Sequence, residues 1–259
     1  MPDGEVSNWK IPTGGDAAFS AYGPLVVLPS GTLMQTIYGW GKGYYRIWGI
    51  YSFDDGYRWN YGREIWRTSV AMPNETAAAY VDGRTDWTSR LIAVHRSARR
   101  VDGRWFGYIM QSVSTDGGRT WRQAGVIGKE TRRGVIPWIA NIGKGRLALL
   151  TAVRDHDDLS INVSIAPAWK VVSNPRAWPE PRTIYRSRLM DTERIKIGSI
   201  EQSKNFGDFG YQSIVRTGPT DADLFVVLMD SHNGHSGFKP DDYPSNTELV
   251  MIPLFGETL

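Results

Sequence analysis

Four residues of this chain have side chains that could act together on one ligand: Glu75, Arg96, Arg154 and Tyr211. An arginine binds a carboxylate through two parallel hydrogen bonds, so two arginines suit a ligand that carries carboxylates. A glutamate beside them can transfer a proton or stabilise a positively charged transition state, and a tyrosine can be a nucleophile or a binding group. Each has a structural alternative: a strand end for Glu75, ion pairs for the arginines and core packing for Tyr211.

These residues are far apart in the sequence, so only a fold that gathers distant segments can form a site from them. A repeat points to such a fold: the pattern Ser-x-Asp-x-Gly-x-x-Trp begins at Ser52 and again at Ser114, 114 − 52 = 62 residues later. Its aspartate can accept bonds within a turn, its glycine allows positive φ, and its tryptophan gives the next strand an apolar face. The residues that we interpret as structural parts of these turns are Asp54, Gly56, Trp59, Asp116, Gly118 and Trp121.

The spacing of this repeat predicts an all-β fold, a β-propeller of four-stranded blades. Strands are expected at residues 25–28, 32–38, 46–52 and 63–67, then at 76–81, 91–94 and 105–113, then at 135–142, 146–153 and 159–165, and finally at 195–200, 211–216, 224–229 and 249–253. Four units are clear, and a length of 259 residues at roughly 40–50 residues per blade predicts five blades, with six as the alternative. The whole chain, 1–259, is then one domain, in which residues 1–18 are a linker or a strand that closes the ring.

The propeller topology predicts which residues meet. The start of each blade's first strand and the end of its second strand lie on one face, the mouth, whereas the Ser-x-Asp turns lie on the opposite face. The expected mouth residues at strand-one starts are Tyr22, Glu75, Trp138 and Tyr211. Those at strand-two ends are Tyr38 with Trp40, Arg96, Arg154 with Asp155 and His156, and Asp230 with His232. We expect Trp40, Tyr44, Trp138, Asp155 and His156 to bind substrate around the four candidate catalytic residues.

The two repeated turns resemble the Asp-box of the sialidase superfamily, which implies a propeller whose boxes face away from the active site. The stretch from Asn74-Glu75 through residues 91–96 resembles the sialidase segment with the active-site glutamate and a triad arginine, and residues 85–90 would be an insertion in it. Residues 209–213 resemble the segment of the nucleophilic tyrosine. The resemblance therefore implies roles for Glu75, Arg96 and Tyr211.

Two sialidase features are missing. Ala21-Tyr22-Gly23-Pro24 stands where the first triad arginine is expected, and residues 39–43 contain no general-acid aspartate. The pattern is more similar to the catalytic propeller of phage tailspike endosialidases, which keep a glutamate and two arginines. Residues 136–139, followed by Arg154, resemble their second arginine segment.

The expected function is to bind and cleave an acidic polysaccharide containing sialic or uronic acid, as an endosialidase-like glycosidase. One alternative is a non-catalytic, receptor-binding propeller that only recognises a glycan. Another is a polysaccharide lyase on the same fold, with His95 or His156 and Tyr211 as the base. The expected partner is an acidic polysaccharide or cell-surface glycan, and kinship with tailspikes would imply a homotrimer.

Composition limits the other possibilities. The chain has no cysteine, so disulfides and thiol chemistry are excluded, and its net charge of +3 and pI near 9.0 favour an anionic partner. We find no nucleic-acid motif and no apolar run long enough to span a membrane. His232 and His235 lack a third ligand, so no metal and no cofactor are predicted. No signal peptide is visible at Met1, and we expect an extracellular or virion location.

Overall fold

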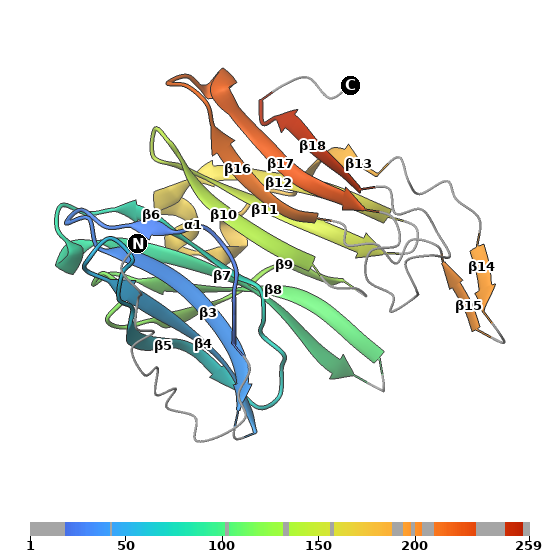
Figure 1. Cartoon of the computed structure of the whole chain (residues 1–259), viewed down its shortest axis with the longest axis horizontal. Helices are drawn as coiled ribbons and strands as arrows, with labels where there is room; N and C mark the ends of the chain where they lie inside the picture. Colours follow the sequence, from blue (N-terminus) through green and yellow to red (C-terminus); the bar gives the residue numbers. More distant parts are fainter. Residues whose placement is uncertain are drawn as a thin grey trace.

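The computed structural model describes residues 19–41, 43–101, 104–131, 135–155, 158–187, 194–197, 200–203, 210–231 and 247–255. In this part of the chain, four antiparallel sheets of three to five strands lie side by side like a fan, and a fifth sheet has only two strands (Figure 1). The four larger sheets are four blades in a β-propeller arrangement, so the all-β prediction is confirmed and the prediction of five blades is wrong. The strands are longer than the spacing estimate assumed, up to 12 residues in β7, so each blade uses more of the chain.

Blade one consists of β1 (Phe19–Ala21), β2 (Val26–Val27), β3 (Leu33–Gly41), β4 (Tyr44–Ser52) and β5 (Asn60–Thr68). Both β1 and β2 pair with β3, so the innermost strand is interrupted and the continuous strand predicted at 25–28 is not formed. In the interruption Gly23 has a φ of 92°, and a Cβ atom there would lie 2.6 Å from the Cα atom of Ala77 in blade two. Glycine therefore permits the close approach of the first two blades.

Blade two consists of β6 (Thr76–Asp82), β7 (Arg90–Val101), β8 (Arg104–Ser114) and β9 (Arg122–Thr131). The insertion predicted at 85–90 forms a short 3-10 turn over Asp86–Thr88. The carboxylate of Asp86 accepts hydrogen bonds from the backbone nitrogen, at 3.0 Å, and the hydroxyl of Ser30. The insertion thus ties blade two to a turn of blade one.

Blade three consists of β10 (Val135–Gly143), β11 (Arg146–Asp155), β12 (Asp158–Pro167) and β13 (Arg182–Arg186). Where a third Ser-x-Asp turn could stand, the chain forms α1 (Ala168–Ser173) and a 3-10 turn over Pro175–Ala177. Gln111 of blade two donates to the Val171 carbonyl at 2.8 Å and accepts from Trp178 Nε1 at 3.0 Å, which fixes this segment against its neighbour. None of the helices in the described residues is long and apolar enough to cross a membrane.

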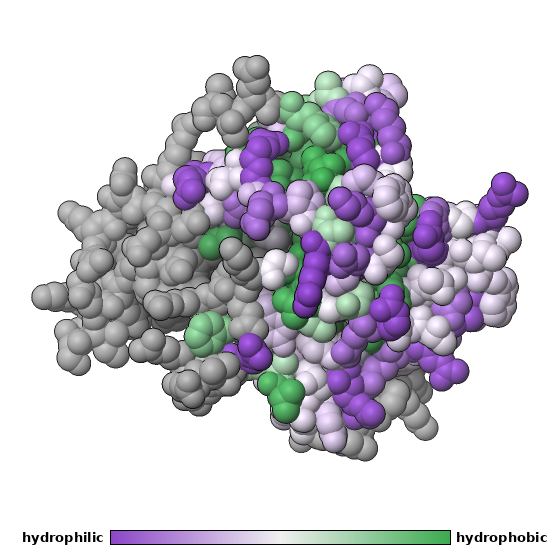
Figure 2. Space-filling model, turned by 180° about the vertical axis from the view of Figure 1, so that it is seen from behind, coloured by the Kyte–Doolittle hydropathy of each residue, from purple (hydrophilic) through white to green (hydrophobic). Residues whose placement is uncertain are grey.

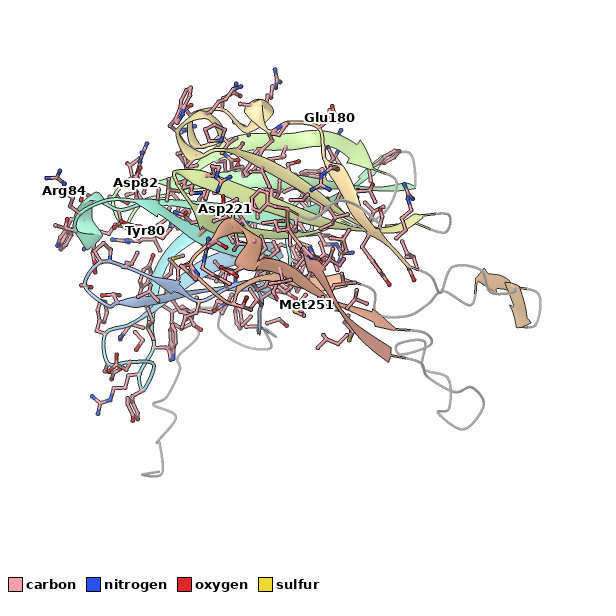
Figure 3. All side chains as sticks on the ribbon, turned by 90° about the horizontal axis from the view of Figure 1, so that it is seen from above. Tyr80, Asp82, Arg84, Glu180, Asp221 and Met251 are labelled. Carbon is pink, nitrogen blue, oxygen red and sulfur yellow. The ribbon has the colours of Figure 1, made fainter. Side chains whose placement is uncertain are left out.

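Blade four consists of β16 (Gly210–Arg216), β17 (Leu224–Ser231) and β18 (Thr247–Pro253), with a 3-10 turn over Asp221–Asp223. Where one strand was predicted at 195–200, the structure has two paired strands, β14 (Arg194–Ile197) and β15 (Ile200–Ser203), seen apart from the blades in Figure 1. Figure 3 labels Met251 on β18, the last strand of blade four.

Apolar side chains fill the space between neighbouring blades, because alternate residues of each strand point to opposite faces of its sheet. The fully buried side chains include Ile47 and Leu91 between blades one and two, Ile92 and Leu147 between blades two and three, and Leu150 and Val226 between blades three and four. Figure 2 shows the molecule from behind, where purple hydrophilic residues lie among smaller green hydrophobic areas.

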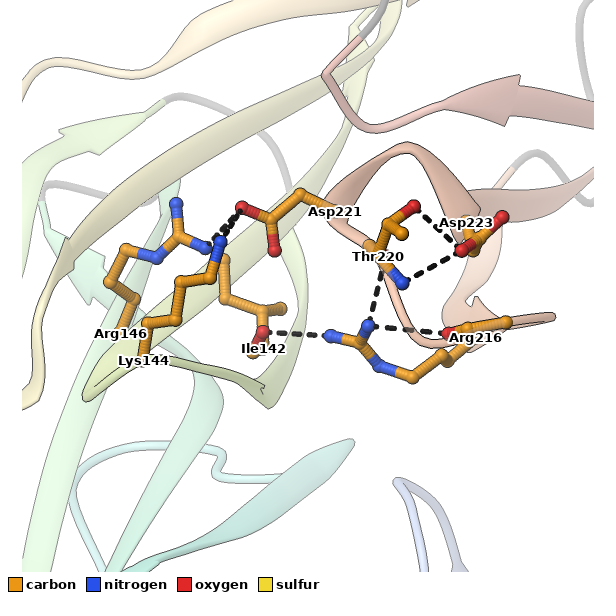
Figure 4. A network of polar contacts seen from close by, with 8 residues as sticks. Ile142, Lys144, Arg146, Arg216, Thr220, Asp221 and Asp223 are labelled. Atoms are coloured by element: carbon orange, nitrogen blue, oxygen red, sulfur yellow. Dashed lines mark hydrogen bonds and ion pairs between the residues drawn. The ribbon is translucent and has the colours of Figure 1, made fainter.

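Charged residues also join blade three to blade four at the end of the molecule that carries the strand-one to strand-two turns. Asp221 accepts from Arg146 at 2.8 Å and from Lys144 at 3.0 Å, and Arg216 donates to the Ile142 carbonyl at 2.8 Å (Figure 4). The hydrogen bonds from Arg146 and Lys144 lower the pKa of Asp221. Figure 3 labels this residue and Asp82, which ends the first strand of blade two.

Candidate active site

Glu75 and Arg96 face each other at the mouth end of blade two. Arg96 N donates to Glu75 O at 3.0 Å, which extends the β6–β7 ladder by one pair and places both side chains on one face. Arg96 Nη1 then donates to Glu75 Oε1 at 2.8 Å. With its nitrogen turned toward the carboxylate, the Asn74 amide donates to Glu75 Oε2 at 3.0 Å. Glu75 is 8% exposed and held by these partners, whereas Arg96 retains further N–H donors for a ligand.

Tyr211 lies at the start of the first strand of blade four in an unusual conformation. Its φ is 46°, and the β16–β17 pairing shifts register between Gly210 and Ser213. A positive φ is strained for a non-glycine residue, and such strain is concentrated at functional sites. Tyr211 is also 43% exposed, so its ring is accessible from solvent.

Aromatic rings from three blades meet beside Tyr211. The ring of Tyr22 from blade one lies 6.3 Å from the ring of Tyr211 and 5.6 Å from that of Trp138 in β10, both in edge-to-face geometry. Trp138 is the fourth residue of its strand rather than the first, as the sequence suggested, and it packs against the core between blades three and four. Tyr211 and Trp138 thus both lie beside Tyr22.

Tyr38 in β3 connects this aromatic group to the charged pair. Burial raises its pKa, the negative charge of Glu75 and the nearby Tyr211 raise it further, and a hydrogen bond with Ser20 and the charge of Arg96 oppose the change. Tyr38 therefore lies within electrostatic reach of Glu75, Arg96 and Tyr211 and stays a neutral phenol that can donate a hydrogen bond. The sequence placed Tyr22 and Tyr38 at the mouth but gave neither residue a role. Tyr22 lies between β1 and β2, and Tyr38 lies near the end of β3; these positions at strand ends were the feature of the sequence that could have indicated a role.

The backbone of Arg154 is placed as predicted, at the end of the second strand of blade three. Its neighbour Val153 pairs with Val135, the first residue of β10, just as His95 pairs with Thr76, the first residue of β6. Arg154 thus occupies in β11 the strand position that Arg96 occupies in β7. Its side chain lies outside the described part of the structure, as do the side chain of Asp155 and all of His156, so their roles stay predictions.

Trp40 and Tyr44 lie on the β3–β4 hairpin at the rim of the mouth. The Trp40 ring is 4.3 Å from that of Tyr45, and the guanidinium groups of Arg46 and Arg67 lie 5.8 Å and 5.4 Å from the Tyr44 ring. Trp40 and Tyr44 are well exposed, at 45% and 40%. These contacts all stay within blade one, so the two aromatic residues form a rim and do not join the Glu75–Arg96 pair.

His95, one of the two histidines offered as the base in the lyase alternative, is not accessible. It is completely buried on the face of β7 that looks toward blade one, where Nε2 lies 2.9 Å from Ser112 Oγ and Nδ1 lies 3.2 Å from Thr76 Oγ1. Its ring also packs near that of Trp66, at 5.8 Å. Burial lowers the pKa of His95 to about 3, so it is a neutral core residue.

The two Ser-x-Asp turns join the third and fourth strands of blades one and two, at the end of each sheet opposite Glu75 and Arg96. In the second turn, Asp116 Oδ1 accepts from Thr120 N at 2.9 Å, Ser114 Oγ accepts from Gly118 N at 2.8 Å, and Trp121 Nε1 donates to the Gly118 carbonyl at 3.0 Å.

The first turn repeats these three bonds. Asp54 accepts from Arg58 N at 2.8 Å, Ser52 accepts from Gly56 N at 2.8 Å, and Trp59 donates to the Gly56 carbonyl at 3.0 Å. Each fixed residue of the pattern thus closes a bond inside its own turn, which accords with the structural interpretation. Among the described residues, no group of three His, Cys, Asp or Glu side chains is placed to hold a metal ion.

Comparison with known proteins supports the fold. No family model matches the chain, and no curated protein matches its sequence. Among solved structures, a Dyadobacter fermentans protein of unknown function has 16% identity and a TM-score of 0.56 over 90% of this chain and 54% of its own. A Bombyx mori GH32 β-fructofuranosidase has 11% identity and a TM-score of 0.55, over 90% of this chain and 46% of its own.

A Penicillium chrysogenum α-L-arabinanase, in complex with arabinobiose, has 13% identity and a TM-score of 0.52, over 90% of this chain and 64% of its own. At such low identities the likeness shows the fold alone. The chain spans about half to two thirds of the length of these three proteins.

Proposed function

We propose that the mouth of this propeller binds an acidic polysaccharide and hydrolyses it. The observation that carries the proposal is the Glu75–Arg96 pair, closed at 2.8 Å and lying within electrostatic reach of Tyr38 of blade one, which in turn lies within electrostatic reach of Tyr211 of blade four. A glycosidase class is further supported by two of the similar structures, which are named as an arabinanase and a fructofuranosidase.

Each group has a proposed role. Arg96, together with Arg154, binds the carboxylate of a sialic or uronic acid unit through its free N–H donors. In the reaction, water adds across the glycosidic bond: its hydroxyl joins the anomeric carbon and its proton ends on the leaving oxygen. Glu75 carries the proton during this exchange. Tyr211 either stabilises the charge on the anomeric carbon or attacks it as the glycosidic bond breaks, in which case water then hydrolyses the bond between the tyrosine and the sugar. The neutral phenol of Tyr38 donates a hydrogen bond to the sugar.

A second candidate, a propeller that binds the glycan without cleaving it, is favoured by a specific observation. Glu75 is nearly buried and already bonded by Arg96 and Asn74, and the segment around Tyr22 supplies no additional cation or carboxylate to the mouth. A homotrimer and an extracellular or virion location stay predictions in either case.

The test is a panel of sialic-acid and uronic-acid polymers, scored for binding and for new reducing ends. We expect Glu75→Gln to spare binding and abolish cleavage, and Arg96→Lys to weaken transition-state binding by about 2–4 kcal/mol because an ammonium cannot form the planar fork. Arg90→Lys is the matched control, since Arg90 begins the same strand and pairs with Asp82 at the opposite end.

The outcomes separate the candidates. Cleavage unchanged in Glu75→Gln would remove Glu75 from the chemistry. Binding without any new reducing end would establish the non-catalytic propeller, and products with a new double bond that absorbs near-ultraviolet light would establish a lyase. Equal effects of Arg96→Lys and Arg90→Lys would exclude the mouth as the binding site.

A further inference from the structure

We propose that the groove between blades one and two, on the face opposite the mouth, is a second binding site, for an acidic oligosaccharide. The groove has a volume of about 1030 Å³. One wall is the start of β5 and the other is the Ser-x-Asp turn of blade two, residues 117–121. The site is distinct from the mouth, and the proposal does not depend on whether the mouth is catalytic.

Aromatic rings give the groove flat apolar surfaces. The ring of Tyr51 crosses its floor from blade one to blade two, and Phe53 and Trp121 also line it. The side chain of Phe53 is 72% exposed, and contact of so much apolar ring surface with water is unfavourable in free energy. Flat rings suit the apolar C–H face of a sugar, because the negative face of the ring attracts those hydrogens. The lining contains a single aliphatic side chain, Leu28.

Two glycines make the placement of Tyr51 possible. A Cβ atom on Gly62 would lie 2.2 Å from Tyr51 Cε2, and one on Gly118 would lie 1.9 Å from Tyr51 Oη. The hydroxyl of Tyr51 donates toward the carbonyls of Gly117 and Gly118, at 3.4 Å and 3.3 Å. The ring is thus fixed across the groove before any ligand arrives, which lowers the entropy cost of binding.

The charge of the groove is determined by Arg63. Glu64 is paired with Arg67 at 3.5 Å, and the negative charge of Asp86, which accepts hydrogen bonds from Ser30, is opposed by the nearby positive charge of Arg119. Arg119 donates to a backbone carbonyl and stacks over the ring of Trp87. Arg63 is exposed and has no ion pair with any residue that the structure describes, so the charge left for a ligand is positive.

A bulge in β5 directs Arg63 into the groove. Tyr61 pairs with Ile50 and Glu64 pairs with Trp48, so Gly62 and Arg63 together stand opposite Gly49. Without the extra residue, Arg63 would follow the alternation of the strand onto the other face of the sheet. Bulges re-aim side chains in this way next to binding sites.

The same strand argues against a peptide as the occupant. β5 is the outer strand of blade one, but its register shifts twice, and the charged residues Arg63, Glu64 and Arg67 interrupt its free edge. These features oppose the pairing of another strand. An unpaired arginine beside flat rings instead fits a sugar that carries a carboxylate.

The test uses hexamers of galacturonic acid and of α2,8-linked sialic acid as probes, with neutral maltohexaose for comparison, in calorimetric titrations of the whole chain. Arg63→Ala should weaken binding of an acidic hexamer about tenfold, the effect of losing one charge-assisted contact. Arg58→Ala, which removes an equal charge from the neighbouring turn outside the groove, should leave the affinity unchanged. Hydrogen exchange should show protection of residues 60–64 and 117–121, and Arg96→Ala should not remove it.

Three results would overturn the proposal. One is equal weakening by Arg63→Ala and Arg58→Ala, which would indicate only a general charge effect. Another is protection confined to the mouth, or protection of the groove that disappears in Arg96→Ala. The third is binding of peptides but of no acidic hexamer. If the mouth is not catalytic, no new reducing ends will appear, but binding that depends on Arg63 will persist. The two proposals can therefore fail independently.

Discussion

The buried neutral state of His95 predicts a specific pH dependence of stability. The side chain is 0% exposed and is surrounded by Thr76, Ser112 and Trp66, none of which supplies a charge. Burial lowers the pKa of His95 to about 3, from 6.5 for an exposed histidine. As the pH falls below 6.5, the unfolded chain therefore binds a proton at His95 that the folded chain does not, and the free energy of unfolding decreases.

The magnitude follows from the difference in pKa. At pH 5 the solution is about 1.5 pH units below the pKa of His95 in the unfolded chain, so His95 is protonated there. In the folded chain His95 stays neutral over the whole range from pH 8 to pH 5. At about 1.4 kcal/mol per unit, the folded chain should lose about 2 kcal/mol of stability from His95. Carboxylates with lowered pKa, such as Asp116, contribute mainly below pH 4, where their protonation removes stability, so the window from 8 to 5 isolates histidine.

The assay is urea unfolding at pH 8, 7, 6 and 5 for the natural chain and for His95→Gln, whose amide can still bond Ser112. Contributions of the other three histidines are common to both proteins and cancel in the comparison. We expect the variant to lose about 2 kcal/mol less over this range. Parallel loss in both proteins would refute the reasoning. Should the variant fold poorly, NMR titration of the natural chain decides, because a His95 resonance that titrates above pH 5 would equally refute it.

Two further predictions concern the face opposite the mouth. Asp116→Ala removes bonds from Thr120 and Ser114 and should lower stability by about 1–2 kcal/mol, seen as a fall of roughly 2–8 °C in melting temperature, whereas Asp116→Asn keeps the acceptor to Thr120 N and should cost less. Loss of mouth-dependent glycan cleavage in a fully stable Asp116→Ala protein would contradict this structural role. Gly62→Ala places a Cβ atom against the ring of Tyr51 and should cost about 1–3 kcal/mol in urea unfolding by overpacking; an unchanged midpoint would show that the ring can move aside.

The sequence determined those features whose interactions are local. The turns at residues 52–59 and 114–121 could be interpreted in full, because the serine, aspartate, glycine and tryptophan of each pattern bond within eight consecutive residues. The opposition of Glu75 and Arg96 was also accessible, since two consecutive strands of one blade must pair as a hairpin and alternation then places both side chains on one face.

The tertiary structure decided whatever depends on contacts between blades. The number of blades depends on which strands pair at long range, and alternation alone could not show that β1 and β2 share one partner or that β14 and β15 pair with each other outside the blades. The accessibility of a histidine cannot be judged from its own strand, because the neighbouring blade buries His95. The approach of Tyr22 and Tyr38 to Tyr211, and the path of Tyr51 across two glycines, likewise arise only when separate sheets pack face to face, since no local pattern encodes the distance between them.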